Sequence, residues 1–338
     1  MVNRTGTCGP SIISLGRCAG RTSQGSGTVA IGSNAGVTSQ SAGSVAVGSY
    51  AGQICQGLET VAIGAGAGQF TQTVQAVAIG TCAGRTRQGQ FSVAIGYEAG
   101  QCYQSANSVS VGVAAGQEYQ GCGAVAVGRS AGQLYQGTNG IAIGKFTAEN
   151  SQGVCSIAMG YASGNNYQGK CSVAIGTLAG YQYQGQNAVA IGDSAGYNSQ
   201  TSFSVAIGVN SGLCHQGFES VALGACTAAQ SQGNNTVALG SFSAKYYQGS
   251  CSIAIGNSAG QYYQGANSIA IGRCAGYINT TSGIAANTIV LNATGSPLAG
   301  TYTNALYIKS IRHPGSSIPS GFYPMYYNPT TGEIVVVY

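Results

Sequence analysis

The stretch SVAIGYEAGQCYQSANSVSVG, residues 92–112, contains nearly the same five-residue pattern twice. Ser92-Val93-Ala94-Ile95-Gly96 returns sixteen residues later as Ser108-Val109-Ser110-Val111-Gly112. The spacing continues in both directions, because glycine stands at every sixteenth residue from Gly16 to Gly272 without insertion or deletion. A fixed period of this length is typical of a solenoid in which each repeat forms one coil. We number the repeat positions so that Gly16 and its equivalents occupy position 16.

Three neighbouring positions of the repeat define a strand. Position 13 is always Val or Ile, position 15 is always apolar, and position 14 between them is Ala, or Ser at Ser14 and Ser110. A short alternating triplet that ends in glycine predicts a β-strand followed by a turn, and the Ala-Gly-x-x-x-Gln-Gly half predicts a second extended segment. Repeated glycines exclude a helical repeat. The sequence therefore predicts an all-β protein, a parallel β-solenoid of about seventeen sixteen-residue coils over residues 11–280.

Glycine is expected to set the turns of each coil. It occupies position 16 throughout, position 4 in most coils and often position 9. Glycine reaches positive φ values that other residues adopt only with strain. We expect positive φ at these three positions.

Position 8 of the repeat is always glutamine from the second coil on. In a stack of parallel coils each of these amides lies above its counterpart, so it can donate to one neighbour and accept from the other. We therefore predict a structural glutamine ladder. Its members are Gln24, Gln40, Gln56, Gln72, Gln88, Gln104, Gln120, Gln136, Gln152, Gln168, Gln184, Gln200, Gln216, Gln232, Gln248 and Gln264.

Position 14 forms a column of small side chains on the strand face opposite to positions 13 and 15. An exposed strand face would be expected to carry Thr, Lys, Glu or Gln in some coils. A sixteen-residue coil is expected to be too flat to cover this face itself, so we predict a homo-oligomer with another copy of the chain packed on the alanine column. That column is Ala30, Ala46, Ala62, Ala78, Ala94, Ala126, Ala142, Ala158, Ala174, Ala190, Ala206, Ala222, Ala238, Ala254 and Ala270.

Positions 5–7 are predicted to face solvent, and position 7 is rich in tyrosine. Two interpretations stay open: the rings bind a glycan or protein receptor, with Gln101, Gln117, Gln133 and Gln261 beside them, or they stack on one another and stiffen the sheet. The tyrosine column consists of Tyr103, Tyr119, Tyr135, Tyr167, Tyr183, Tyr247 and Tyr263. The net charge of +5 includes no run of Lys or Arg, so we expect no nucleic-acid partner.

The twelve cysteines and two histidines show no metal-binding pattern. No CxxC occurs, and His215 and His313 do not complete a zinc motif, so we predict no metal and no cofactor. Mostly free thiols fit assembly in a reducing cytosol, although Cys155 and Cys171 share a position in adjacent coils, where a vertical disulfide stays an alternative.

Seven carboxylates in the chain leave no evident acid–base pair. No catalytic histidine of the kind that hexapeptide acyltransferases use is marked, and no flat threonine array suggests an ice-binding solenoid. We predict that the protein is not an enzyme.

The N-terminus shows no apolar export signal, and no stretch of about 18 apolar residues predicts a membrane span.

Both ends depart from the repeat. Residues 281–338 break the sixteen-residue register and hold five of the six prolines. We expect them to form a small β cap and trimerisation segment, with a turn at 328–332 between two short strands. Residues 1–10 are expected to cap or tether the other end.

The repeat resembles the head repeats of trimeric autotransporter adhesins, the YadA-like family. The family's recurring N-S-V-A-I-G is matched by Asn187-Ala188-Val189-Ala190-Ile191-Gly192 and by Asn267-Ser268-Ile269-Ala270-Ile271-Gly272. The resemblance implies a trimer of left-handed parallel β-rolls that is used for attachment. The repeat is sixteen residues long where the family usually has fourteen. This longer form, with the segments 287–295, 306–312 and 327–333, resembles fibre or spike proteins of large DNA viruses and phages.

The expectation is therefore a rigid homotrimeric rod, a fibre or spike component of a virus particle used in attachment. It would lie on the virion surface or outside the cell after assembly in a reducing cytosol. The alternative is a structural filament in a cell or extracellular matrix, in which the same rods join end to end.

Overall fold

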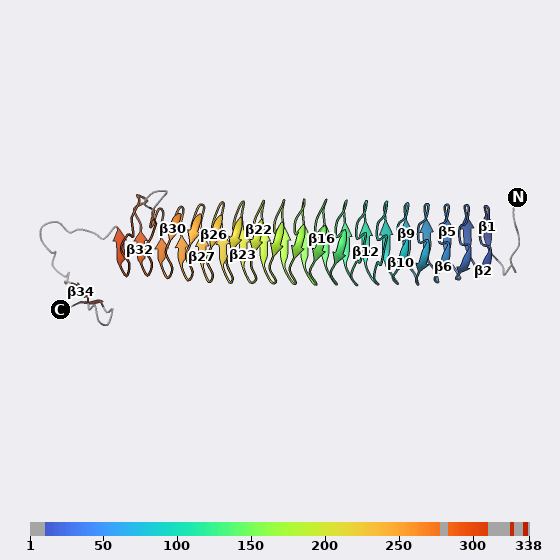
Figure 1. Cartoon of the computed structure of the whole chain (residues 1–338), viewed down its shortest axis with the longest axis horizontal. Helices are drawn as coiled ribbons and strands as arrows, with labels where there is room; N and C mark the ends of the chain where they lie inside the picture. The colour runs from blue at the N-terminus through green and yellow to red at the C-terminus, as the bar shows by residue number, and fades with distance from the viewer. Residues whose placement is uncertain (1–10, 278–282, 310–324, 328–333, 337–338) are drawn as a thin grey trace.

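The computed structural model describes residues 11–277, 283–309, 325–327 and 334–336. The chain winds into a long rod of stacked coils, and its secondary structure in these residues consists of strands and turns (Figure 1). None of the described residues forms a helix that could cross a membrane. The predicted all-β parallel solenoid with a sixteen-residue repeat is confirmed.

The first sheet of the rod collects repeat positions 13–15 of every coil and runs from one end to the other. It has nineteen strands. They are β1 (Ile13–Leu15), β3 (Val29–Ile31), β5 (Val45–Val47), β7 (Val61–Ile63), β9 (Val77–Ile79), β11 (Val93–Ile95), β12 (Val109–Val111), β13 (Val125–Val127), β15 (Ile141–Ile143), β17 (Ile157–Met159), β19 (Val173–Ile175), β21 (Val189–Ile191), β23 (Val205–Ile207), β25 (Val221–Leu223), β27 (Val237–Leu239), β29 (Ile253–Ile255), β31 (Ile269–Ile271), β32 (Ile289–Asn292) and β33 (Leu306–Lys309).

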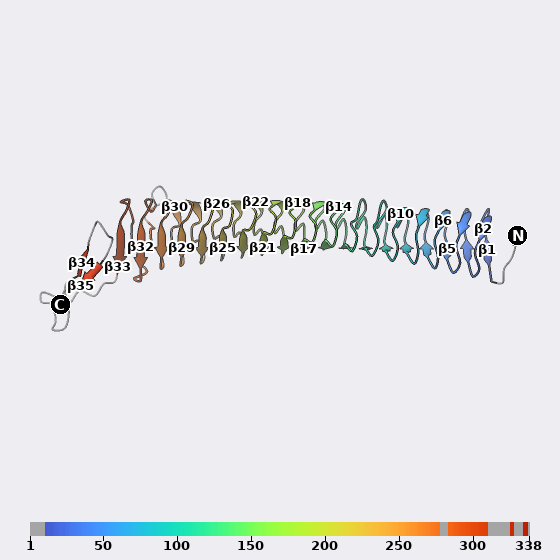
Figure 2. The ribbon, with the colours of Figure 1, turned by 90° about the horizontal axis from the view of Figure 1, so that it is seen from below.

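The second sheet collects positions 6–8 and is divided into five and nine strands. Between the two parts, Cys102 and Glu118 continue the column as isolated bridges. The strands are β2 (Thr22–Gln24), β4 (Thr38–Gln40), β6 (Ile54–Gln56), β8 (Phe70–Gln72), β10 (Thr86–Gln88), β14 (Leu134–Gln136), β16 (Asn150–Gln152), β18 (Asn166–Gln168), β20 (Gln182–Gln184), β22 (Asn198–Gln200), β24 (Cys214–Gln216), β26 (Gln230–Gln232), β28 (Tyr246–Gln248) and β30 (Tyr262–Gln264). Figure 2 shows strands of the two sheets on opposite sides of the rod.

Every coil repeats the backbone pairing of the coil before it. Val93 lies opposite Val109, and Gln72 opposite Gln88, in parallel register. The amide of Val93 donates to the carbonyl oxygen of Ser108 at 2.9 Å. From Ile13 to Ile271 the pairing partners in the first sheet are sixteen residues apart, so each residue stacks on its equivalent in the next coil.

The alanine column lies inside the rod. In each coil of the first sheet the middle residue points inward and its two neighbours point outward, and every alanine of the column is at most 1% exposed in the single chain. The prediction that a second chain covers these alanines is therefore wrong. The chain covers them itself.

In the sixteen-residue coils the interior beside position 14 holds only the small side chains of alanine and serine. The alanines pack against the position 3 alanines of the following turn, such as Ala35, Ala51 and Ala67. A Cβ placed on Gly100 would lie 3.2 Å from the Cβ of Ala94 and 2.7 Å from Oε1 of Gln104. Small columns at positions 3, 4 and 14 therefore line one shared interior, and their size reflects its width.

More residues with side chains have positive φ values in the turns than the sequence predicted. Positions 16 and 4 have positive φ as expected, for example +131° at Gly96 and +53° at Gly100. Position 9 does not: Gly57 has an ordinary φ, but a Cβ there would lie 2.7 Å from the carbonyl carbon of Thr73. Positions 2, 7 and 11 adopt left-handed φ in almost every coil with side chains such as Tyr103 and Cys155. A left-handed φ is costly for a single residue, so the stacked backbone hydrogen bonds must hold it.

The stack does not end at residue 280. Strands β32 and β33 extend the first sheet in parallel register, with Ile269 opposite Ile289 and Ile289 opposite Leu306. The sixteen-residue register does not continue past the predicted boundary at 280/281, but longer coils extend the sheet beyond it to Lys309. Further on, β34 (Met325–Tyr327) and β35 (Ile334–Val336) form an antiparallel pair, as the expected turn required. Residues 1–10 and the turn itself lie outside the described residues.

The narrow interior leads to a test with matched small-to-large changes. Ala94→Leu should lower the free energy of unfolding by about 1–3 kcal/mol or more, because the added carbons have no space beside Gly100. Val113→Leu adds one methylene at a side chain that is 47% exposed and should leave the melting temperature nearly unchanged. Thermal melts followed by circular dichroism measure both. Equal melting of Ala94→Leu and the parent protein would contradict the placement of the alanine column.

Candidate functional site

The glutamine ladder crosses the interior of the rod. Gln136 donates from Nε2 to the carbonyl oxygen of Val125 on the facing strand at 2.8 Å and to Oε1 of Gln152 at 3.0 Å. Its own Oε1 accepts from Gln120 at 3.0 Å. The same bonds recur along the column, whose members from Gln40 on are at most 4% exposed. The amides thus join the two sheets of one coil and each coil to the next.

One serine substitutes for alanine within the ladder. Ser110 accepts from Nε2 of Gln104 at 3.4 Å and donates to Oε1 of Gln120 at 2.8 Å. The Ser110 hydroxyl group thus bridges Gln104 and Gln120, whose amides do not bond to each other directly. Other buried hydroxyls also have partners: Ser163, Ser211 and Ser243 donate to position 14 carbonyl oxygens of the following turn at 2.6–2.8 Å.

The ladder is not continuous. Six members have a buried Oε1 that accepts no hydrogen bond from any described residue; they are Gln24, Gln40, Gln56, Gln104, Gln216 and Gln232. Each of these residues still donates from Nε2 to a backbone carbonyl or side-chain oxygen, as Gln216 does to Val205 at 2.7 Å. The bond across the interior is therefore the more constant part of the pattern, and the coil-to-coil bond the more variable one.

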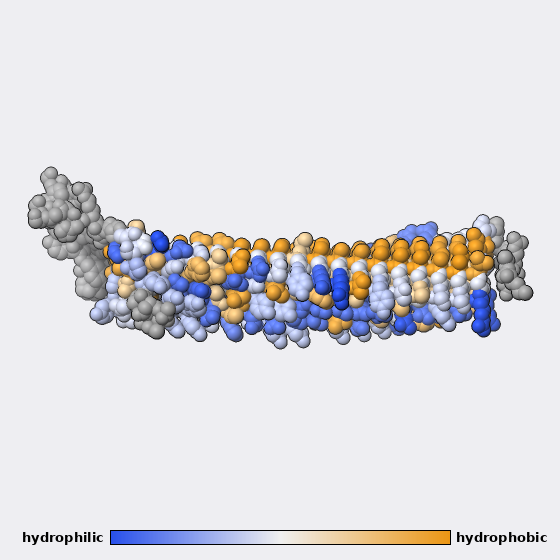
Figure 3. Space-filling model, turned by 90° about the horizontal axis from the view of Figure 1, so that it is seen from above, coloured by the Kyte–Doolittle hydropathy of each residue, from blue (hydrophilic) through white to orange (hydrophobic). Residues whose placement is uncertain are grey.

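The outward residues of the first sheet form an apolar stripe. We define the aliphatic ridge as positions 13 and 15 of the repeat, from Val29 and Ile31 to Ile269 and Ile271. At position 15, eight of these side chains are 36–40% exposed. Figure 3 shows the ridge as an apolar stripe along one side of the rod, above a mostly polar face. The sequence pattern showed this ridge, but we expected the opposite face of the strand to be the one in contact with another chain.

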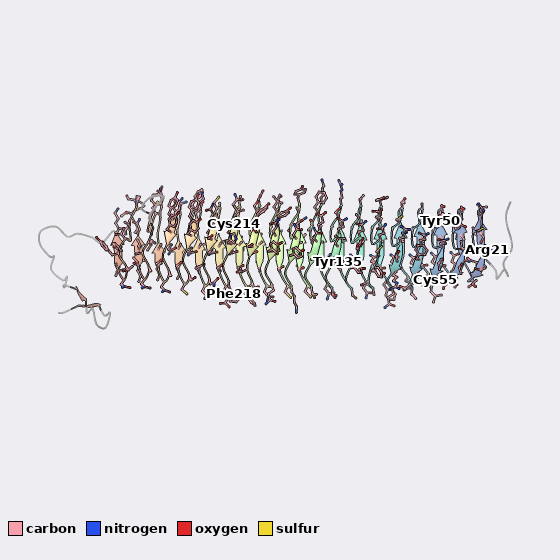
Figure 4. The ribbon with its side chains drawn as sticks, in the orientation of Figure 1. Arg21, Tyr50, Cys55, Tyr135, Cys214 and Phe218 are labelled. Atoms are coloured by element: carbon pink, nitrogen blue, oxygen red, sulfur yellow. The ribbon has the colours of Figure 1, made fainter. Side chains whose placement is uncertain are left out.

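The tyrosine column stacks on itself. Tyr103, Tyr119 and Tyr135 form one stack, with ring centroids 4.9 and 5.1 Å apart and interplanar angles of 3° and 4°. Tyr167 and Tyr183 form a second stack at 5.4 Å, and Tyr247 and Tyr263 a third at 5.2 Å. Within each stack, neighbouring rings cover the faces that they turn toward each other, as the interpretation of mutual stacking requires. Figure 4 labels Tyr135, which ends the first stack.

Glutamines beside the tyrosines make a second, surface ladder. At position 5, Gln69 donates to Gln53 at 2.9 Å, Gln117 to Gln101 at 3.3 Å, and Gln133 to Gln117 at 2.7 Å. Asn150 donates to Asn166 at 3.0 Å in the next column. Three of the glutamines that we expected to assist a ligand, Gln101, Gln117 and Gln133, therefore bond to one another within the protein.

The eleven described cysteines are free thiols. This holds for Cys155 and Cys171, so the alternative of a disulfide between them is not realised in this structure. Cys102 lies in the part of the second sheet that forms only isolated bridges. Burial, and then the nearby Glu118 carboxylate, raise the pKa of the Cys102 thiol.

The described residues contain no group of three His, Cys, Asp or Glu side chains that could hold a metal ion. His215 lies at position 7 of β24, whereas His313 lies outside the described residues. A shallow groove on the second sheet is lined by Ser231, Tyr247 and Tyr263. Comparison with protein-family models, curated proteins and solved structures gave no match for this chain.

The glutamine ladder predicts an unequal effect of two glutamine-to-leucine changes. Gln136→Leu would leave Oε1 of Gln152 without the donor that it has in the ladder and would remove the bonds from Gln120 and to the carbonyl oxygen of Val125. A buried polar group left unpaired costs about 1–3 kcal/mol. Gln133→Leu removes a partly exposed amide of the surface ladder, where water replaces the lost bond, and should cost less than half as much. Chemical unfolding of both variants measures the difference. Equal stability of Gln136→Leu and Gln133→Leu would show that the buried ladder has no special role.

The raised pKa of Cys102 predicts slow alkylation of this thiol. At pH 8 a smaller fraction of Cys102 is thiolate, so iodoacetamide should modify it several-fold more slowly than the exposed Cys155 and Cys171. Glu118→Gln removes the nearby negative charge and should accelerate the reaction at Cys102 alone. Peptide mass spectrometry over time measures each rate. A Cys102 that reacts as fast as Cys155 and does not respond to Glu118→Gln would refute this assignment.

Proposed function

We propose that the protein is a structural rod that assembles as a parallel homotrimer through its aliphatic ridge and serves as an attachment fibre. The observation that carries the proposal is the ridge itself, which leaves large apolar side chains on the surface along the whole rod. Soluble monomers rarely expose a continuous apolar patch of that extent. Burial of the ridge would stabilise an assembly by about 25 cal/mol for each Å² of apolar surface removed from water.

A second copy of the same chain is the best partner for the ridge. The ridge repeats with the spacing of the coils, so a parallel copy in register presents side chains at the same intervals over the full length. Over residues 11–277 the interior of a single rod contains alanine, serine, threonine and glutamine, and the Val and Ile side chains of the ridge lie outside it. In the assembly these residues would supply the apolar core that the single chain lacks. The number three and the left-handed winding are supported by the resemblance to YadA-like head repeats.

The second sheet would then face outward. It carries the tyrosine column and the surface amides, which could meet a glycan or protein receptor. The resemblance to viral fibre and spike repeats supports a place on the virion surface or outside the cell, after assembly in a reducing cytosol, with a virion or filament component as the attachment partner. The proposal includes no catalytic activity and no nucleic-acid partner.

A filament of rods joined end to end is the competing arrangement, and images of purified particles would show threads in place of rods of one length.

The homotrimer predicts a particle of three times the chain mass of 33.7 kDa in light scattering after size-exclusion chromatography. Ile175→Asp on the ridge should shift the mass toward one chain, because a charge on the apolar contact would be buried without a partner. Ser199→Asp lies on the second sheet at a left-handed position that aspartate tolerates, and it should leave the mass unchanged. A stable monomer of the parent protein, or loss of assembly in Ser199→Asp only, would contradict the proposed contact.

A further inference from the structure

The tyrosine column contains one gap of a single coil. Position 7 is tyrosine at Tyr135 and Tyr167, but the coil between them has Ser151. The other gap between tyrosines spans three coils, from Ser199 to Ser231. A single missing ring thus separates the stack that ends at Tyr135 from the stack that begins at Tyr167.

The backbone directs the three side chains alike. Tyr135, Ser151 and Tyr167 have φ values of +54°, +56° and +56°. Two steps at the strand spacing place the centroids of Tyr135 and Tyr167 about 10 Å apart. A planar ring midway would lie about 5 Å from each centroid, which is the spacing within the stacks and within the range that aromatic pairs prefer.

The ring faces at the gap are open. Tyr119, with a tyrosine on both sides, is 46% exposed, whereas Tyr135 and Tyr167 are each 57% exposed. The neighbours of Ser151 do not fill the space, because Asn150 bonds to Asn166 and Gln152 belongs to the buried ladder. Two aromatic faces therefore border a slot with a small serine at its base.

We propose that the slot between Tyr135 and Tyr167, over Ser151, binds one planar aromatic ring of a ligand. A planar ring repeats the geometry of the missing tyrosine on both of its faces, whereas a puckered sugar ring is thicker and does not. The slot gives the proposed attachment role a specific site. It lies on the second sheet, so it does not depend on the contact through the ridge.

The chain has no tryptophan, so an indole probe can be excited with little background from the protein. The test is a titration of the full chain with 3-methylindole, followed by fluorescence excited at the red edge of indole absorption. We expect saturable binding to the parent protein. Ser151→Tyr closes the slot with the residue that this column already uses, and it should weaken binding at least tenfold. Tyr167→Ser removes one wall and should weaken it similarly.

Ser199→Tyr is the matched control. It adds the same residue at the same repeat position next to Tyr183, away from the slot, and it should bind the probe as the parent protein does. Circular dichroism confirms that each variant keeps the fold. The proposal is overturned if the parent protein shows no saturable binding or if Ser151→Tyr binds as well as Ser199→Tyr. Displacement of the probe by an equal concentration of a methyl glycoside would assign the slot to sugars and overturn the aromatic ligand. Particle mass measured on the same samples keeps this outcome separate from the assembly proposal.

Discussion

The width of the rod is set by one side chain, the glutamine at position 8 that reaches across the interior. Its Nε2 group donates to the position 13 carbonyl of the facing strand in coil after coil, for example at 2.8 Å from Gln136 to Val125. Glutamine is thus a spacer between the two sheets as well as a partner for the next coil. With that spacing fixed, positions 3, 4 and 14 of the sixteen-residue coils hold glycine, alanine, serine and, at Thr147 and Thr227, threonine. The large aliphatic residues must then lie outside.

This arrangement inverts the usual location of apolar residues. A globular chain places its largest aliphatic side chains in its own core, whereas this rod packs methyl groups and amides inside and displays Val and Ile on one flank. On the opposite side of the rod, the parallel register places the tyrosines of successive coils above one another, so their rings stack into rows. Each row is only as long as the sequence keeps tyrosine in the column, so a single serine opens a slot. Sequence variation within a rigid repeat can therefore create local features without any change in the backbone.

Much of this could be predicted from the sequence, since a strict period fixes which residues stack. The parallel solenoid, the two strands per coil, the outward tyrosines and the buried glutamines all followed from columns. The orientation of the first strand did not, because alternation identifies two faces without saying which one is inside. The structure decides it through the close approach of Gln104 and Ala94 to Gly100, where an added Cβ would lie 2.7 Å from Oε1 of Gln104 and 3.2 Å from the Cβ of Ala94. The extension past residue 280 was also missed, because β32 and β33 pair at intervals other than sixteen residues.

Photo-crosslinking tests the central claim most directly. With p-benzoyl-phenylalanine incorporated at Ile191 on the ridge, irradiation should join chains of the purified protein into dimers and trimers on a denaturing gel. The same group at Tyr183 on the second sheet should give single chains. Efficient crosslinks from Tyr183 with none from Ile191 would contradict the account, because the aliphatic ridge would then not be the surface on which the chains meet.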